Sequence, residues 1–189
     1  MIRDEKQSKK KNIEREVTEW VFSIVIAVAL ALLIHNFVFQ IVRVDGPSME
    51  PTLYTNERMA VTKFSYYFTE PKRGDIVVTQ FPNDKSNYVK RVIGLPGETL
   101  EIKDGKVYID GDVLEEPYIK EEILADYGAI EIPEGKYMVM GDNRNNSRDS
   151  RYVSIGPLDK SLIVGKSQYV VWPFDELHRL NHYTGHLEQ

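Results

Sequence analysis

The sequence predicts a mostly β protein, in which an antiparallel β-sheet domain follows one N-terminal transmembrane helix. The first observation is an apolar segment, residues 20–42, in which no side chain carries a formal charge apart from the usually neutral His35. The second is a change of pattern after Arg43, where short β-rich runs alternate with turn-forming residues. The third is the composition: 189 residues with 42% hydrophobic side chains can bury the core of one domain of ordinary size.

The apolar segment is long enough to cross a bilayer, because about 20 helical residues span the hydrocarbon layer. Only Ser23 interrupts the apolar run over residues 21–34. A cleavable signal peptide would have a shorter core followed by a small-residue cleavage site, and no Ala-x-Ala follows this core. A buried core helix that is apolar all round would need a larger domain to cover it. We therefore expect residues 17–42 to form a membrane anchor.

The charge distribution predicts the orientation of that anchor. Residues 1–16 form a basic tail, although the whole chain carries a net charge of −5. The positive-inside rule places this tail in the cytoplasm and residues 43–189 on the extracytoplasmic side of the cell membrane. The acidic average argues against a nucleic-acid partner. The lack of cysteine excludes disulfides, thiolate zinc sites and cysteine nucleophiles, and we expect neither a metal nor a cofactor.

Residues 43–189 are expected to form one domain of antiparallel sheets, because several short strands alternate with frequent turns. Asp104 and Gly105 stand between two apolar runs, which is a strong signal for a two-residue hairpin. The predicted strands are residues 59–64, 75–81, 88–93, 99–102, 106–109, 137–140 and 167–172.

Two parts of this domain show no clear strand pattern. Residues 115–134 are acidic and irregular, and we expect a small excursion at about residues 110–135. Residues 178–189 hold three of the four histidines without metal-ligand spacing. We expect these last residues to form a surface tail.

Ser48 is the first candidate for chemistry. Gly46, Pro47 and Pro51 surround it and predict a rigid turn, from which a hydroxyl can project outward as a nucleophile must. On this segment alone, a plain turn serine is the simpler interpretation.

Lys90 is the second candidate, because it lies within an apolar β-like run. Strand alternation places Lys90 on one face and Arg91 on the other, each among apolar neighbours. If Lys90 enters an apolar site, desolvation lowers its pKa and lets it accept a proton from a serine hydroxyl. The alternative is that both are solvated charges at a sheet edge.

The third candidate is the polar segment of residues 141–151, rich in acids, arginines and turn formers. It lacks the ligand and glycine positions of an EF-hand calcium loop. A loop tied by Asp/Arg pairs is the more natural interpretation, and a mobile surface loop is the alternative. Only His35 precedes residue 178, so a Ser/His/Asp triad would need a histidine from the tail. Lysine is therefore the expected base for Ser48.

Together these segments resemble the boxes of type I signal peptidases, in particular the compact Gram-positive form. The resemblance extends over residues 17–172, with the boxes in the same order behind an N-terminal anchor. The nucleophile, strand, base and last boxes correspond to residues 48–53, 74–78, 88–94 and 141–151.

The resemblance implies a role for each site residue. Ser48 would attack the scissile carbonyl and Lys90 would take its proton. Ser147 would hydrogen-bond to Lys90 and orient it, and the Ser48 backbone N–H would donate to the oxyanion. Some members add a hydroxyl donor at the position of Gly46, so the second oxyanion donor here is open. Ion pairing within the last box would involve Asp142, Arg144, Asp149 and Arg151.

The resemblance also implies a membrane-bound serine endopeptidase. It would remove signal peptides from exported preproteins after small residues of the Ala-x-Ala type, at the lipid bilayer and near the secretion translocon. Two other classes of protein are alternatives. A non-catalytic anchored module would not need an intact Ser/Lys dyad, and a self-cleaving repressor would need a DNA-binding domain in place of residues 1–42.

Overall fold

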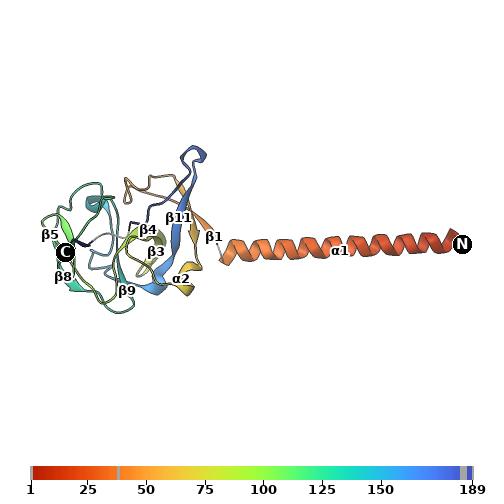
Figure 1. Cartoon of the computed structure of the whole chain (residues 1–189), viewed down its shortest axis with the longest axis horizontal. Helices are drawn as coiled ribbons and strands as arrows, with labels where there is room; N and C mark the ends of the chain where they lie inside the picture. Colours follow the sequence, from red (N-terminus) through yellow and green to blue (C-terminus); the bar gives the residue numbers. More distant parts are fainter. Residues whose placement is uncertain (1, 38, 184–186, 189) are drawn as a thin grey trace. The chain divides into compact units, whose positions relative to one another are not determined.

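The computed structural model describes residues 2–37, 39–183 and 187–188, with side chains for residues 15–32 and 39–183. The chain forms two compact units, Met1–Phe39 and Gln40–Gln189. The first is the long helix α1 and the second holds the sheets (Figure 1).

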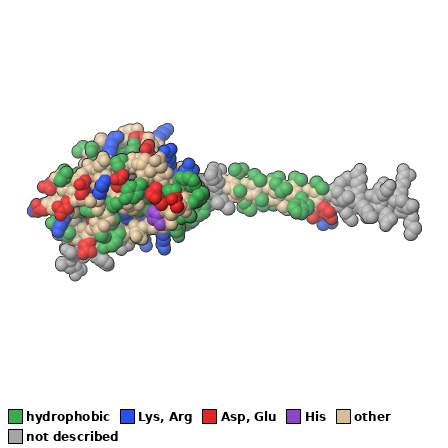
Figure 2. All heavy atoms as spheres, turned by 90° about the horizontal axis from the view of Figure 1, so that it is seen from above, with side chains coloured by type: hydrophobic (Ala, Val, Ile, Leu, Met, Phe, Trp, Pro, Cys, Tyr) green, Lys and Arg blue, Asp and Glu red, His purple; other side chains and the backbone are tan. Residues whose placement is uncertain are grey.

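The first unit consists of α1, which extends over Ile2–Phe37. Hydrophobic side chains cover much of its described length, and charged ones gather at one end of it (Figure 2). These apolar side chains are exposed, as Phe22 (66%) and Leu32 (57%) illustrate. Among the described residues, no helix has both the length and the mean hydropathy that a membrane span requires. Positions 33–38 of the predicted anchor lie outside the described side chains.

The second unit is mostly β, as the sequence predicts. Its larger sheet has eight strands in the described residues, in the order β1-β2-β11-β3-β4-β9-β10, with β12 also paired to β11. The pairing is antiparallel for β2 with β11, β11 with β3, β3 with β4, β4 with β9, β9 with β10 and β11 with β12. In chain order these strands are β1 (Phe39–Arg43), β2 (Arg58–Thr62), β3 (Ile76–Phe81), β4 (Asp84–Gly94), β9 (Lys136–Met140), β10 (Leu158–Asp159), β11 (Ile163–Trp172) and β12 (His178–Arg179).

The smaller sheet has five described strands in the order β13-β7-β6-β5-β8. These strands are β5 (Thr99–Lys103), β6 (Lys106–Ile109), β7 (Asp112–Leu114), β8 (Tyr127–Glu131) and β13 (Leu187–Glu188). The short helices of the domain are α2 (Ser65–Phe68), η1 (Arg144–Asn146), η2 (Lys160–Leu162) and η3 (Phe174–Glu176).

The hairpin predicted at Asp104 and Gly105 is confirmed. Lys103 pairs with Lys106, and the two turn residues have φ of 50° and 79°. Positive φ at both central positions is what a type I′ turn requires, and its twist suits the flanking strands.

The excursion expected near residues 110–135 is more regular than its sequence indicates. It contains β7 and β8, both of which belong to the smaller sheet. Ile123 and Ile132 are 4% and 0% exposed and pack into the core of that sheet. Buried isoleucines spaced among acids therefore give the segment its structure.

The expectation of a surface tail is wrong for Leu180 and His182, whereas His178, Arg179 and Asn181 are exposed as expected. β12 pairs with β11, and Leu180 is buried in the core of the larger sheet. The Ile76 N–H donates to His182 Nδ1 over 3.2 Å. Burial, followed by the nearby Lys166, lowers the pKa of His182 to about 4, so the ring is neutral at pH 7. Residues 184–186 and 189 of the predicted tail lie outside the described residues.

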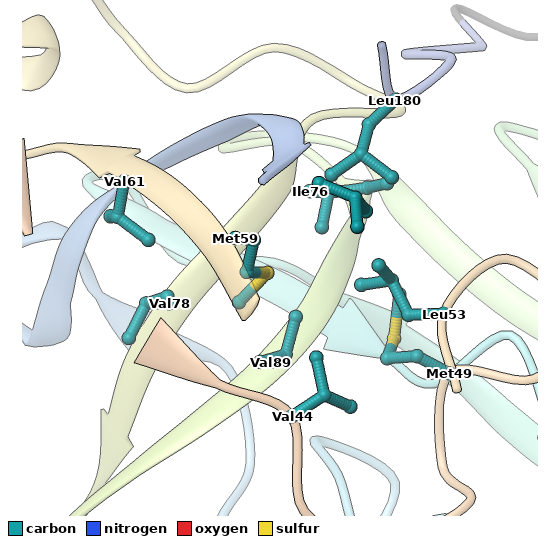
Figure 3. Close-up of a cluster of buried hydrophobic side chains, with 10 residues drawn as sticks. Val44, Met49, Leu53, Met59, Val61, Ile76, Val78, Val89 and Leu180 are labelled. Carbon is teal, nitrogen blue, oxygen red and sulfur yellow. The ribbon is translucent and has the colours of Figure 1, made fainter. Parts of the chain in front are cut away.

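One core cluster lies directly behind residues 46–53, which form the turn that carries Ser48. We call this segment the Ser48 turn. Met49 and Leu53 come from this turn and pack with residues of β2, β3 and β4, and Figure 3 shows them together with Val44, Val89 and Leu180. Met49 is 1% and Leu53 0% exposed. Because two side chains of the turn are buried in the core, the position of Ser48 is tied to the packing of the sheet.

Candidate active site

The Ser48 turn is a rigid local structure. Gly46 has φ of +87°, a backbone region that other residues rarely adopt. Hydrogen bonds from Glu50 N to Pro47 O (3.1 Å) and from Leu53 N to Met49 O (3.0 Å) close the turn. Met49 points into the core, whereas the neighbouring Ser48 is only partly buried. The turn therefore presents the Ser48 hydroxyl at the surface of a fixed frame.

Lys90 lies on β4, where it pairs with Val77 of β3. The residue is 2% exposed. Its Nζ lies 2.8 Å from Ser48 Oγ and 3.0 Å from the Val89 carbonyl oxygen. In the described part of the chain, no carboxylate forms an ion pair with Nζ. The structure thus brings the two candidate residues together from positions 42 apart in the sequence.

Burial lowers the pKa of Lys90 to about 8, because desolvation disfavours the ammonium form. The charges of Asp149 and Asp142 act in the opposite direction, and the charge of Arg151 lowers the pKa further. At neutral pH an appreciable fraction of this amine is therefore unprotonated, with its lone pair within reach of the Ser48 hydroxyl.

The polar segment of residues 141–151 holds the Ser48 turn from the other side. Asn143 N donates to Ser48 O and Asn143 Nδ2 donates to Pro47 O, both over 3.1 Å. A Cβ on Gly141 would lie 2.3 Å from Ser48 O and 2.3 Å from Ser147 Oγ. Any side chain at Gly141 would thus push the two segments apart.

Asp142 pairs across the sheet with Arg91, not within its own segment as expected. Arg91 Nε and Nη2 donate to the two carboxylate oxygens over 2.9 and 2.7 Å. The side chains are 1% and 0% exposed. Thr52 Oγ1 also donates to Asp142, over 2.5 Å. This pair fastens the last box to β4 and to the Ser48 turn at once.

Arg144 likewise finds its partner outside the segment. Two of its guanidinium nitrogens donate to Glu116 over 2.6 Å each, and Nε donates to the Gly141 carbonyl over 2.9 Å. The ring of Tyr118 stacks on Arg91 at 3.9 Å, and Arg144 lies 6.0 Å from the same ring. Of the four expected ionic residues, only Asp149 and Arg151 pair with each other, over 2.8 Å.

Arg91, Glu116 and Tyr118 belong to this site but are not among the site residues predicted from the sequence. Arg91 had a signal, because strand alternation places it among apolar residues on the face opposite to Lys90. Glu116 and Tyr118 had only the acidic character of the excursion, which does not identify a partner.

Ser147 lies near Ser48 but makes no hydrogen bond to Ser48 or Lys90. It is 8% exposed, and within the described residues its Oγ makes no hydrogen bond. The expected Ser147–Lys90 hydrogen bond is therefore absent from this structure, in which Lys90 Nζ bonds to Ser48 Oγ and Val89 O. An ammonium has three N–H donors, so one remains for a third partner.

The Ser48 backbone N–H is free of competing partners. The described backbone hydrogen bonds of turns and loops include none from this amide. Gly46 offers no side-chain donor, and an added Cβ would contact nothing within 4 Å. A hydroxyl beside a desolvated amine, with an unengaged amide at the same residue, is an arrangement that can carry out acyl transfer.

Comparison with known proteins gives an independent view of the chain. The family model described as signal peptidase, peptidase S26, matches residues 17–172. Signal peptidase I of Bacillus licheniformis is 45% identical over 186 residues, covering 93% of this chain and 98% of that protein. Signal peptidases I S and I T of Bacillus subtilis (strain 168) are 44% and 45% identical. They cover 95% and 92% of this chain and 100% and 93% of their own lengths.

Proposed function

Since the chain belongs to the signal peptidase family, peptidase S26, and is a peptide-bond hydrolase of that family, we propose that it removes signal peptides from exported preproteins with a Ser48/Lys90 dyad. The observation that carries this proposal is the 2.8 Å contact between Ser48 Oγ and a Lys90 Nζ that is buried without an ion-pair partner among the described residues.

In the acylation step, Ser48 Oγ attacks the scissile carbonyl carbon while its proton passes to neutral Lys90. The Ser48 N–H donates to the developing oxyanion. The C–N bond then breaks, and the Lys90 ammonium gives its proton to the leaving amine. In deacylation Lys90 takes a proton from a water molecule, which attacks the ester carbonyl. As the ester C–O bond breaks, the Lys90 ammonium returns this proton to Ser48 Oγ and the free enzyme is restored.

Ser147 and the ion pairs position these groups. Ser147 Oγ is the proposed third partner of the Lys90 ammonium. Asp142, Arg144, Asp149 and Arg151 hold residues 141–151 in shape, and Asn143 transmits that shape to the Ser48 turn.

We further propose that residues 17–42 anchor the enzyme in the cell membrane, with residues 1–16 in the cytoplasm and the β domain on the extracytoplasmic side. The apolar side chains of α1 are uncovered along its described part, which suits a lipid environment. Only five residues separate Val42 from Ser48, so the nucleophile lies within about 20 Å of the end of the anchor. The cut would then occur at the bilayer surface, where preproteins emerge from the secretion translocon.

The proposed specificity is for small side chains one and three residues before the cut, of the Ala-x-Ala type. Shallow apolar pockets accept a methyl group and exclude larger groups by clash, which discriminates strongly. Residues 41–44 and β3 are the proposed sources of the pocket walls.

Cleavage of a test preprotein in detergent micelles tests the dyad and the proposed specificity in one assay. The wild type should cut an Ala-x-Ala site, and Ser48→Ala should not cut it. A matched control is Ser86→Ala, an exposed serine on the same strand as Lys90. A preprotein with Leu or Phe just before the cut should remain uncut. Equal cleavage of that substrate would contradict the pocket proposal, and cleavage by Ser48→Ala would contradict the dyad.

A further inference from the structure

An open groove lies next to residues 141–151, and Arg144, Ser147 and Arg151 are part of its lining. It has a volume of about 520 Å³. Residues 124–127 contribute to its lining, as do Tyr152 and Val153 on the turn that follows Arg151. We call this feature the Leu124 groove.

The loop that lines the groove is fastened to the last box by a side-chain amide. Asn145 Oδ1 accepts a hydrogen bond from Leu124 N over 3.0 Å, and Asn145 Nδ2 donates to Glu122 O over 2.9 Å. The buried Arg144–Glu116 pair holds the same excursion further back. These contacts make the groove a formed feature of the fold rather than a gap between loose loops.

The apolar side chains that line the groove are exposed to solvent. Leu124 is 86%, Tyr152 52% and Val153 102% exposed. Apolar side chains gathered on one concave surface favour a ligand more than scattered exposed residues do. Their hydrophobic surface suits an apolar or aromatic side chain of a bound peptide.

The groove reaches the proposed nucleophile through Ser147. Ser147 lines the groove, is 8% exposed, and has an Oγ without a hydrogen-bond partner in the described chain. Ser147 Oγ and Ser48 O both lie 2.3 Å from the point where a Gly141 Cβ would stand, so the two atoms are close neighbours. Ser147 therefore connects the lining of the groove to the Ser48 turn.

The groove lies toward the end of the domain that is away from β1. Tyr127, which lines it, begins β8, and β8 and β1 are at opposite ends of the unit formed by residues 40–189 (Figure 1). β1 directly follows α1 in the sequence. A signal peptide precedes its cut with an apolar core that stays in the membrane, so its last residues approach Ser48 from the β1 end. The residues after the cut leave at the β8 end.

From this geometry we propose that the Leu124 groove binds the preprotein segment just after the cut, the first residues of the mature chain. It selects an apolar or aromatic side chain within the first few of these residues. This inference rests on the proposed function of the dyad, and it adds a determinant of specificity on the mature side of the cut.

The test uses three full-length preproteins that share one signal peptide and one Ala-x-Ala site. They differ only at the second to fourth residues after the cut, which are all Leu, all Ser or all Asp. The enzymes are the full-length wild type, Leu124→Ser/Val153→Ser, and the control Phe68→Ser, whose side chain is 83% exposed on α2. The substituted side chains are exposed, so circular dichroism should show an unchanged fold.

The wild type should cleave the Leu substrate with a kcat/KM about tenfold above that of the Ser substrate, mainly through KM. The double variant should lose this preference, and Phe68→Ser should keep it. The proposal is overturned if the wild type shows no preference after the cut, or if the double variant keeps the preference. It is also overturned if the double variant alters only the response to residues before the cut. Failure of the proposed function has a different signature, because the wild type would then cleave none of the three substrates.

Discussion

Lys90 and Arg91 are adjacent buried cations on β4, and their surroundings are opposite in kind. Arg91 is 0% exposed and makes two hydrogen bonds to Asp142, one to the Gly74 carbonyl and a stacking contact with Tyr118. Lys90 is 2% exposed and contacts a serine hydroxyl and a carbonyl oxygen. No carboxylate among the described residues forms an ion pair with it.

The difference distinguishes a structural charge from a reactive one. A buried cation with a complete set of partners stays charged and holds segments together. A buried cation without a counter-charge has a lowered pKa, which makes it a base but costs stability. Alternation along the strand places these two environments on its opposite faces, one residue apart.

The largest expected effect is the loss of activity when either residue of the proposed dyad is replaced. Lys90→Ala and Ser48→Ala should each lower kcat/KM for a test preprotein by at least about 1000-fold, and the double variant should be little worse than either single one. Single-turnover cleavage assays measure this effect. Substantial activity in Lys90→Ala would remove Lys90 from the mechanism.

Replacement of Arg91 should lower the stability of the domain. Arg91→Met leaves Asp142 buried without its partner, which should cost about 3–5 kcal/mol in the free energy of unfolding. Urea denaturation of the domain gives the value. Arg91→Met/Asp142→Leu should recover part of the loss, because the double variant leaves no buried charge unpaired. A loss of less than about 1 kcal/mol in the single variant would mean that this pair does not hold the last box.

The same substitution at Lys90 should have the opposite sign. The pKa of Lys90 is about 8 in the folded protein and near 10.5 as its ordinary value. The buried ammonium therefore costs stability below about pH 8, and the cost disappears as the pH rises toward 10.5. Lys90→Met should raise the free energy of unfolding by up to about 3 kcal/mol at pH 7.

Denaturation at several pH values checks the sign. The gain from Lys90→Met should shrink between pH 8 and 10.5, whereas the loss from Arg91→Met should not change with the Lys90 titration. A destabilised Lys90→Met variant at pH 7 would show that Lys90 is a structural charge like its neighbour.

The sequence predicted the reactive face better than the structural one. Ser48 and Lys90 could be paired because each stands in a recognisable box. Arg91 and Asp142 are 51 residues apart, and Glu116 and Arg144 are 28 apart. Their pairing depends on β9 lying next to β4 and on the path of the acidic excursion, and residue periodicity specifies neither.

The structure of residues 178–182 was also not predictable from the sequence. Leu180 is a single apolar residue among polar ones, and β12 has only two residues. No period can be read from so short a segment, although Leu180 is 2% exposed in the core behind Ser48. Strands such as β5 and β6 were predictable because their alternation is local and their turn has a strong signal.

The smallest expected effect is a shift in the titration of Lys90. The charge of Asp149 raises the pKa of Lys90, so Asp149→Asn should move the ascending limb of kcat/KM to lower pH by less than about one unit. The Gly141 N–H donates to the Asp149 carboxylate over 3.0 Å. Because the substitution weakens this contact, it should also lower kcat. A limb that moves to higher pH would mean that another group controls it.

The pH dependence of kcat/KM for the wild type tests the central claim most directly, with a substrate that has no titrating side chain near the cut. Only neutral Lys90 can accept the Ser48 proton, so kcat/KM should rise about tenfold per pH unit below about pH 8 and level off above it. The control is an unchanged fold by circular dichroism across the range. An ascending limb centred near 10.5, or no change between pH 7 and 9, would contradict a desolvated lysine as the base.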